Sequence, residues 1–223
     1  MVRSLTRDGT RRFYDRLGAG QDRQAFYEDA ATRRLVELAH FDRAEAVLEL
    51  GCGTGRFAGS LFEQYLSRDC RYVGVDLSPH MVELATDQLA LWQERARVRV
   101  GAVDDPLPDD DGAFDRVVAN YVFDLLLPDD TAAALAEAAR VLRPGGVLCT
   151  TSLTHGVTSA SRALMRAWTA AWRRRPMAVG GCRPIALADA LEPAGWHILR
   201  REVVVAWAVP SEVVVATPPA ATG

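Results

Sequence analysis

The chain has 223 residues, of which 49% are hydrophobic and 25% are charged, and its formal net charge is −3 at pH 7. This composition is that of a single ordinary globular domain, which at this length buries most of the surface that its unfolded chain exposes. The slightly acidic balance provides no basic field for a polyanion, so we expect no nucleic acid as a partner.

The cysteines and the first residues of the chain favour a cytoplasmic protein. The 4 cysteines form no Cys-x-x-Cys pair and no ligand cluster with the 4 histidines, so we expect reduced thiols and no metal site. The N-terminal segment contains no apolar signal sequence, and no run of apolar residues is long enough to span a membrane.

Helices and strands are expected to alternate along the first two thirds of the chain. Residues 1–20 are rich in Arg, Gly and Asp and are expected to start disordered, and a helix should follow over 24–41. Short apolar runs predict strands over 45–50, 72–75, 98–100, 114–120 and 147–153, and helices are expected between them over 56–66, 78–95 and 130–142. Such alternation predicts a doubly wound parallel sheet.

The alternation changes after residue 153. A helix is expected over 160–175, a loop over 176–184, a short helix over 186–191, and β-rich runs over 196–207 and 212–216. We therefore expect an α/β fold with a Rossmann-like, doubly wound, seven-stranded sheet that is mostly parallel with a C-terminal antiparallel strand. The single domain 1–223 would comprise an N-terminal helical extension (1–44), a core (45–153), a lid-like insertion (154–185) and a C-terminal helix with a β-hairpin (186–216).

A glycine-rich turn follows the first expected strand. The run VLELGCGTGR over 47–56 places Gly51, Gly53 and Gly55 between a buried strand and a helix. Alternate glycines let the backbone approach a ligand without a Cβ clash, and the following helix points its first amides at that ligand. A dinucleotide turn needs a small residue where this chain has Arg56, so a nicotinamide-dependent oxidoreductase is the weaker alternative.

The glycine-rich run VLELGCGTG is followed along the chain by VGVDLSPHM, then by FDRVV and RVLRPGG. In this order the four segments resemble the motifs of class I S-adenosylmethionine-dependent methyltransferases, in particular the ubiquinone and menaquinone group. The resemblance covers residues 45–153. It implies S-adenosylmethionine as the cofactor and methyl transfer to a small-molecule acceptor, with 45–153 as the cofactor-binding core.

The resemblance also implies a set of cofactor contacts. Asp76 ends the second strand, where an ionised carboxylate can accept both ribose hydroxyls. Glu49 is a candidate partner for the methionine ammonium, or else an acid that holds the strand–loop corner. Relatives commonly carry an acid where this chain has Ala102, so adenine would be bound by the Val103 backbone or by Asp104. The remaining candidates, besides the glycines, are Cys52, Leu77, Met81, Asn120 and Tyr121, with the Cys52 side chain expected to be a small buried filler.

Catalytic and substrate residues are less defined, because in-line methyl transfer needs a base only where the acceptor must lose a proton. His155 is the candidate base, with an ordinary loop histidine as the alternative. Tyr14 lies in an FYD run similar to the family's N-terminal YD segment, which folds over the cofactor; it could instead anchor the extension. Asp124, Trp168 and Arg183 are the other substrate candidates. Asp124 could instead be an exposed acid at the start of a helix, Trp168 a packed surface residue and Arg183 a helix cap.

The helix expected over 160–175 allows a second function. Leu164, Trp168 and Trp172 recur at i, i+4 and i+8 beside several arginines. This pattern favours a stripe that packs on the sheet or forms a pocket wall. The alternative is a lipid or quinone-precursor methyltransferase that works at a membrane surface. A non-catalytic cofactor-binding or partner-binding module is a third possibility, supported only by Ala102.

Overall fold

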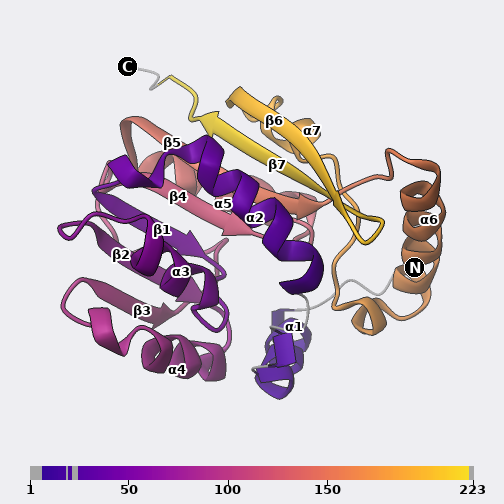
Figure 1. Ribbon diagram of the computed structural model, residues 1–223, viewed down its shortest axis with the longest axis horizontal. Helices are drawn as coiled ribbons and strands as arrows, with labels where there is room; N and C mark the ends of the chain where they lie inside the picture. Colours follow the sequence, from indigo (N-terminus) through magenta and orange to yellow (C-terminus); the bar gives the residue numbers. More distant parts are fainter. Residues whose placement is uncertain (1–6, 19, 22–24, 221–223) are drawn as a thin grey trace.

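The computed structural model describes residues 7–18, 20–21 and 25–220, and these residues form one sheet between helices (Figure 1). The strands are β1 (Ala46–Leu50), β2 (Arg71–Asp76), β3 (Ala96–Val100), β4 (Phe114–Asn120), β5 (Leu142–Leu153), β6 (His197–Ala206) and β7 (Val209–Thr217). The helices are α1 (Arg7–Leu17), α2 (Ala25–Ala39), α3 (Arg56–Gln64), α4 (Pro79–Gln88), α5 (Pro128–Val141), α6 (Ser159–Arg174) and α7 (Leu187–Leu191).

The sheet is seven-stranded, with the order β3-β2-β1-β4-β5-β7-β6 among the described residues. The first five strands in this order pair in parallel, and β7 is antiparallel to both β5 and β6. The expected mostly parallel sheet with a C-terminal antiparallel strand is therefore confirmed. The chain reverses its direction of travel across the sheet between β1 and β4, and open α/β sheets bind ligands beyond the carboxyl ends of the strands at such a point.

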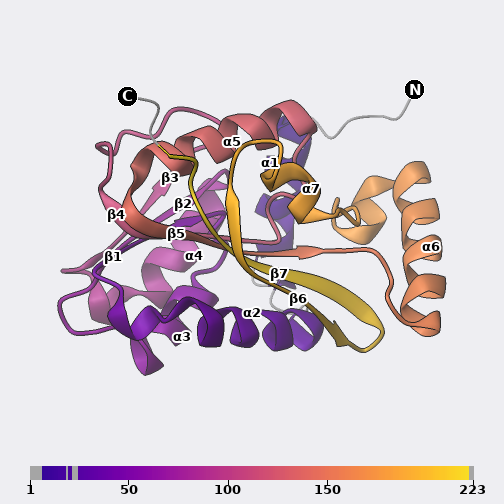
Figure 2. The same ribbon diagram turned by 90° about the horizontal axis from the view of Figure 1, so that it is seen from above.

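Helices cover both faces of the sheet, with α5 and α7 on one face and α2 and α3 on the other (Figure 2). Neighbouring residues of β1 point to opposite faces, so Leu48 and Leu50 pack in the core with Leu135 of α5, whereas Val47 packs in the other core with Leu35 of α2. Both faces of β1 are buried, which explains why its sequence is a nearly continuous apolar run.

The expectation of disorder in residues 1–20 is wrong for the part that the structure describes, because 7–17 form helix α1. The Arg-rich composition was misleading, since these charges have partners that are distant in the sequence. The Arg7 guanidinium pairs with Asp104 and Asp105, and the Ser78 hydroxyl donates to Asp15 at 2.5 Å. Residues 1–6 and 221–223 lie outside the described residues.

Strand β5 begins earlier than expected, at Leu142 rather than at Val147. The pairing with β4 shifts register, because Phe114 pairs with Leu142 while Arg116 pairs with Val147. The Pro-Gly-Gly run therefore lies within an irregular start of the strand rather than before it. The helix expected over 78–95 ends at Gln88 and is followed by a short 3-10 helix over Ala90–Trp92, and the loop expected over 176–184 begins with another, Pro176–Val179. The remaining expected elements are found where the sequence places them, with ends that differ by a few residues.

Helix α6 stands at one end of the molecule, beside the β6–β7 hairpin (Figures 1 and 2). Its tryptophans hold the loop that follows: Trp168 Nε1 donates to the Cys182 carbonyl at 2.9 Å and Trp172 Nε1 donates to the Gly181 carbonyl at 2.7 Å. Trp168 also packs in a small core with Tyr121. The indole nitrogens are thus occupied within the chain. No helix among the described residues is long and apolar enough to cross a membrane.

Candidate functional site

The glycine loop joins β1 to α3 in a conformation that requires glycine. Gly51, Gly53 and Gly55 have φ angles of 70°, 54° and 79°, which lie in the left-handed region that side-chain-bearing residues avoid. A Cβ atom on Gly51 would also lie 2.6 Å from Cγ2 of Val122. The Gly51 amide donates to the Val75 carbonyl at 2.7 Å, which anchors the loop to β2.

Asp76 ties the end of β2 to this loop. One of its carboxylate oxygens accepts the Gly53 amide and the other accepts the Ser78 amide, both at 2.9 Å. Burial raises the pKa of Asp76 above its usual value, and these two amides act in the opposite direction because they favour the ionised form. A carboxylate oxygen has two lone pairs, so each oxygen of Asp76 can accept one further hydrogen bond.

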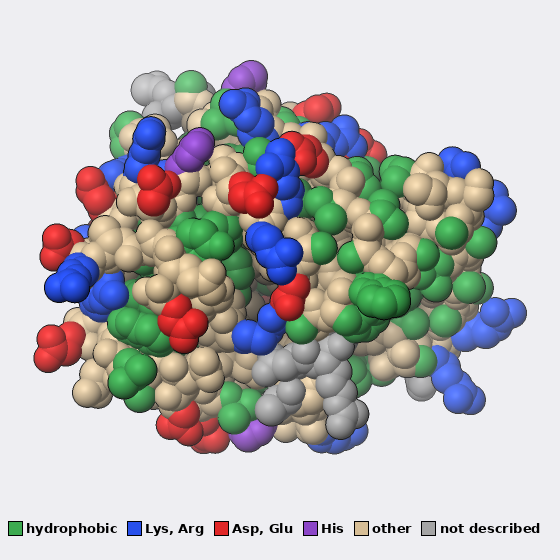
Figure 3. Space-filling model, viewed as in Figure 1, with side chains coloured by type: hydrophobic (Ala, Val, Ile, Leu, Met, Phe, Trp, Pro, Cys, Tyr) green, Lys and Arg blue, Asp and Glu red, His purple; other side chains and the backbone are tan. Residues whose placement is uncertain are grey.

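Two cavities meet at the glycine loop. The narrow cavity, of about 120 Å³, is lined by Asp76, Leu77, Ala102, Val103 and Asp104 and is covered by residues of α1, among others. The wide cavity, of about 290 Å³, lies between α2 and α3 and is lined by residues that include Glu28, Arg33, Glu49 and Arg56. Figure 3 views the face that carries α2 and α3, where side chains of opposite charge alternate near the middle.

The wall shared by the two cavities contains polar atoms that lack partners. Tyr14, Gln21, Gly51, Asn120 and Tyr121 line both cavities. Gln21 Oε1 and Asn120 Nδ2 are buried and have no hydrogen-bond partner among the described residues. Since buried polar groups in folded proteins are nearly always paired, this wall fits a ligand that offers both a donor and an acceptor.

Tyr121 holds a strained position in the same wall. Its φ angle is 55°, which is unusual for a residue with an aromatic side chain. The backbone is held by the Tyr121 amide, which donates to the Thr151 carbonyl at 2.8 Å, and the ring by its hydroxyl, which donates to Ser211 at 2.8 Å. Such over-determined strain is typical of functional positions, and here it turns the residue toward the meeting point of the cavities.

Glu49 has the corner-holding role that the sequence allowed, and it also lines the wide cavity. Its side chain is buried at the end of β1 and accepts the Tyr72 hydroxyl at 2.6 Å, which holds the strand–loop corner. Burial raises the pKa of Glu49 to about 8, and the nearby Arg56 acts in the opposite direction.

The other charges of the wide cavity were not predicted from the sequence. The Arg56 guanidinium lies 2.5 Å from Asp29 and 3.6 Å from Glu28, and burial raises the pKa of Glu28 to about 7. Gln21 and Arg33 were also missed. The sequence held one signal for this face, the i, i+4 spacing of Asp29 and Arg33 on α2.

The structure brings most of the predicted cofactor residues together. Those that line one or both cavities are Glu49, Gly51, Cys52, Gly53, Asp76, Leu77, Val103, Asp104, Asn120 and Tyr121, and the substrate candidate Tyr14 lines both. Gly55 and Met81 line neither cavity. Gly55 caps α3, where a Cβ would lie 3.0 Å from the Ala85 backbone of α4, and Met81 is fully buried in α4.

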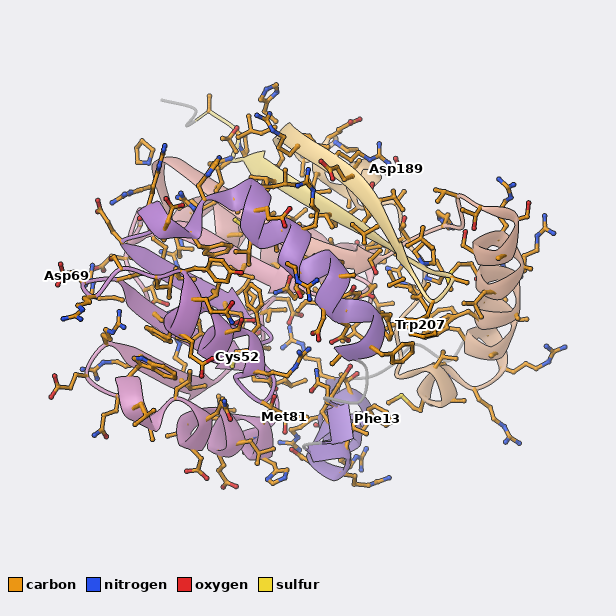
Figure 4. The ribbon with its side chains drawn as sticks, in the orientation of Figure 1. Phe13, Cys52, Asp69, Met81, Asp189 and Trp207 are labelled. Carbon is orange, nitrogen blue, oxygen red and sulfur yellow. The ribbon has the colours of Figure 1, made fainter. Side chains whose placement is uncertain are left out.

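Figure 4 labels Cys52 on the glycine loop, and Met81 and Phe13 where α4 meets α1. The Cys52 side chain packs against β2, because a Cβ atom on Gly74 would lie 2.9 Å from its sulfur. Asp104, the candidate for adenine, already pairs with Arg7 of α1. The Tyr14 hydroxyl donates to the Gly180 carbonyl at 3.4 Å, so this residue links α1 to the loop after α6.

The catalytic candidate and three substrate candidates lie outside the cavities. His155 is exposed after β5, and Trp168 is engaged with Cys182 as described above. Arg183 donates to the Leu126 carbonyl at 2.6 Å. Asp124 is 0% exposed, so the alternative of an exposed helix-start acid is wrong. The Asp124 carboxylate accepts the Leu153 amide at 3.2 Å, and burial raises its pKa to about 7.

No group of three or more His, Cys, Asp and Glu side chains within the described part of the chain is arranged to hold a metal ion.

Comparisons with known proteins show what the chain is similar to. Residues 47–146 match the sequence model of the family described as "Methyltransferase domain". The chain is 36% identical over 122 residues to a malonyl-[acyl-carrier protein] O-methyltransferase of Hahella chejuensis, a match that covers 54% of this chain and 41% of that protein. It is 34% identical over 169 residues to a trans-aconitate 2-methyltransferase of an Azoarcus species, which covers 75% of this chain and 59% of that protein.

The chain thus spans about half the length of the curated relatives it matches. Among solved structures, the [4+2]-cyclase SpnF is similar over 96% of this chain and 97% of its own, with a TM-score of 0.74 and 19% sequence identity, which shows a shared fold alone. The family match and the curated relatives support similarity to S-adenosylmethionine-dependent methyltransferases, and the solved structure shows the shared fold.

Proposed function

We propose that this chain binds S-adenosylmethionine across the two cavities and transfers its methyl group to a small-molecule acceptor. The observation that carries the proposal is the meeting of the narrow and wide cavities at the glycine loop, beside the Asp76 carboxylate. A bound S-adenosylmethionine would supply the methyl group of its sulfonium: the lone pair of an acceptor would form a bond to the methyl carbon as the carbon–sulfur bond breaks, and S-adenosylhomocysteine would leave.

The narrow cavity fits the adenosine part of the cofactor. Each Asp76 oxygen can accept one more hydrogen bond, and the ribose offers two neighbouring hydroxyls for them. Val103 and Asp104 line the same cavity, so the backbone of the first or the carboxylate of the second would bind adenine in the absence of an acid at Ala102. The unpaired Asn120 Nδ2 and Gln21 Oε1 atoms lie in the wall between the nucleoside end and the amino-acid end.

The wide cavity fits the amino-acid part. Glu49 has one hydrogen bond, from Tyr72, and can accept more from an ammonium group. The pKa of Glu49 is raised by burial, and a cation beside the carboxyl would lower it again and favour ionisation. This acid would therefore bind the methionine ammonium.

Residues around the shared wall would orient the acceptor. Tyr14 and Tyr121 line both cavities, and the Tyr121 ring is further fixed by edge contact with Tyr27 at a centroid distance of 5.7 Å. Holding an acceptor against an activated donor accounts for much of the rate that such a transfer needs, because it removes the entropic cost of the encounter. His155 lies outside this wall, so its predicted role as a base has no support from its position.

We further propose a cytoplasmic location and no nucleic-acid partner, because the net charge of −3 and the scattered cysteines favour both. Use of the membrane surface is disfavoured by the indole nitrogens of α6, which bind the chain itself. Liposome co-sedimentation of the protein would reveal such binding if it occurred.

A labelled-methyl screen tests the function. The protein is incubated with methyl-labelled S-adenosylmethionine and a fractionated metabolite extract. We expect the wild type to transfer label to a small-molecule fraction, and we expect the Asp76→Ala protein to transfer much less label to the same fraction. Binding of S-adenosylmethionine without transfer to any fraction would favour a non-catalytic module or another reaction on this fold, since a fold of this type does not by itself define the chemistry.

A further inference from the structure

Basic and acidic residues are unevenly distributed along the chain. Residues 154–188 contain 6 arginines and no acidic residue, although the whole chain has 29 acidic residues and 26 basic ones. Five of these arginines lie in α6 or directly after it, and all five are exposed: Arg162, Arg166, Arg173, Arg174 and Arg175. A basic surface is therefore concentrated at one helix of a chain whose remainder is clearly acidic.

These five arginines lack acidic partners. None of them forms an ion pair among the residues that the structure describes, whereas Arg34 on α2 pairs with both Glu37 and Glu202. The Arg162 guanidinium donates to the Val157 carbonyl at 3.2 Å, which leaves its charge uncompensated. At the end of the molecule where α6 stands, basic side chains project from the viewed face and no acidic side chain is visible beside them (Figure 3).

Three of the arginines share one side of α6. Successive residues of a helix are about 100° apart, so Arg162, Arg166 and Arg173 project within about 40° of one another and span about 16 Å along the helix axis. A different side of α6 faces the protein, because Met165 is buried and the Trp168 indole donates to the loop after the helix. The first three residues form an exposed arginine face that is directed away from the rest of the chain.

The neighbours of the arginine face indicate which anionic partner it suits. Ala163 and Ala167 are exposed one turn apart beside it, so another helix can approach closely. Such small side chains do not insert into a bilayer as the large apolar residues of a membrane-surface helix do. A nucleic acid would extend beyond α6 over the acidic remainder of the chain, which repels a polyanion. The surface therefore suits a short acidic element of about the length of α6.

We propose that the arginine face of α6 docks an acidic helix of a partner protein. Carboxylates spaced along one side of that helix would each accept hydrogen bonds from a guanidinium, which can donate two in parallel. Helix α6 lies outside 47–146, the segment that matches the methyltransferase family model. The docking role is thus separate from methyl transfer and goes beyond it.

The position of α6 places such a partner beside the candidate site. The Trp172 indole donates to the Gly181 carbonyl at 2.7 Å, and the next residue, Cys182, lines the wide cavity. One side of α6 therefore holds a loop that contributes to the cavity wall, while another side carries the arginine face. A docked protein would lie about one helix diameter, roughly 10 Å, from that loop.

Fluorescence anisotropy of a labelled peptide tests the arginine face. The probe is an alanine-rich peptide of about 20 residues, which is long enough to be helical, with glutamates on one side at the spacing of Arg162, Arg166 and Arg173. A second peptide has the same composition with its glutamates spread around the helix. The full chain is titrated at about 0.1 M salt, where charges more than about 10 Å away are screened.

Two triple variants carry the same change of net charge. One reverses the arginine face (Arg162→Glu/Arg166→Glu/Arg173→Glu). The matched control reverses three exposed arginines in or just before β2 and β3, at the far edge of the sheet (Arg68→Glu/Arg71→Glu/Arg97→Glu). We expect the wild type to prefer the one-sided peptide, reversal of the arginine face to weaken its binding by roughly tenfold or more through loss of three ion pairs, and the control to bind like the wild type. The neutral variant Arg162→Gln/Arg166→Gln/Arg173→Gln should lose less affinity than the reversed one.

Several results would overturn the proposal. They are absence of peptide binding by the wild type, equal binding of the two peptides, and equal weakening by the two reversed variants. A fall in the urea stability of both arginine-face variants would also overturn it, because a distorted fold would then explain the loss. Tighter binding of phosphatidylserine vesicles or duplex DNA than of the peptide would assign the face to a membrane or a nucleic acid instead. Failure of the wild type to bind S-adenosylmethionine would refute only the proposed function, because the peptide assay contains no cofactor.

Discussion

Replacement of Asp76 by alanine removes two backbone hydrogen bonds and the proposed ribose ligand at once. The lost bonds join the carboxylate to the Gly53 and Ser78 amides, both at 2.9 Å. A hydrogen bond to a charged group contributes about 1.5–3 kcal/mol. Burial raises the pKa of Asp76, which means that desolvation offsets part of this gain. We therefore expect the free energy of unfolding to fall by about 2–3 kcal/mol for the pair.

The same substitution should also weaken cofactor binding by the protein that remains folded. Loss of two ribose contacts at about 1 kcal/mol each predicts a rise in the Kd for S-adenosylhomocysteine of roughly thirtyfold. Urea unfolding without ligand gives the first quantity and calorimetry gives the second. Asp76→Asn is the matched control, because its amide keeps one acceptor oxygen and should give intermediate values. An unchanged Kd in the folded Asp76→Ala protein would refute the ribose contact, and unchanged stability would refute the role in holding the loop.

Four further changes have defined outcomes. Gly51→Ala places a Cβ 2.6 Å from Val122 at a φ angle of 70°, and should lower the free energy of unfolding in urea by about 1–3 kcal/mol; a wild-type value would mean that the loop can relax. Because the pKa of Glu49 is raised from 4.5 to about 8, its contribution to the stability of the free protein is full below 4.5 and is lost as pH rises through 8. Glu49→Gln should therefore reduce the pH dependence of the free energy of unfolding between pH 4.5 and pH 8, where one titrating group contributes a slope of at most about 1.4 kcal/mol per pH unit. If the free energies of unfolding of the wild type and of Glu49→Gln change in parallel over this range, the raised pKa would be contradicted. His155→Ala should leave the labelling rate nearly unchanged because the side chain is exposed outside both cavities; a loss of about a hundredfold would instead identify a general base. Ala208→Gly should stabilise the β6–β7 turn by about 1 kcal/mol, since Ala208 has a φ angle of 64°, and a lower melting temperature would count against this account of the turn.

The sequence predicts the sheet well because its signals are local. The apolar run of β1 ends at glycines, and the five parallel strands are short runs separated by helices, so the layer order follows from periodicity and connection rules. The positions of Gly51 and Asp76 at the ends of adjacent strands β1 and β2 follow from the same argument.

The N-terminal part of the site could not be predicted in the same way. Helix α1 is stabilised by contacts such as Arg7 with Asp104, whose partners are distant in sequence and cannot be identified from composition. The side of α2 that faces the glycine loop depends on how α2 packs on β7. Glu28 and Arg33 therefore look like ordinary surface charges until the sheet is assembled.

Asp124 was misjudged for a related reason. Its sequence neighbours suggest the start of a helix, but the chain between β4 and α5 turns inward and is covered by the segment around Cys182 and Arg183. The Arg183 amide donates to the Asp124 carbonyl at 3.0 Å. Burial of this carboxyl is thus a consequence of the segment after α6, which no local pattern encodes.

Titration of the full chain with S-adenosylmethionine by calorimetry tests the central claim most directly. Binding at the meeting point of the two cavities predicts one S-adenosylmethionine per chain. The Asp76→Ala substitution should weaken this binding, and NAD should not bind with a comparable affinity. Absence of binding at millimolar S-adenosylmethionine, or equal binding by the Asp76→Ala protein, would contradict the account.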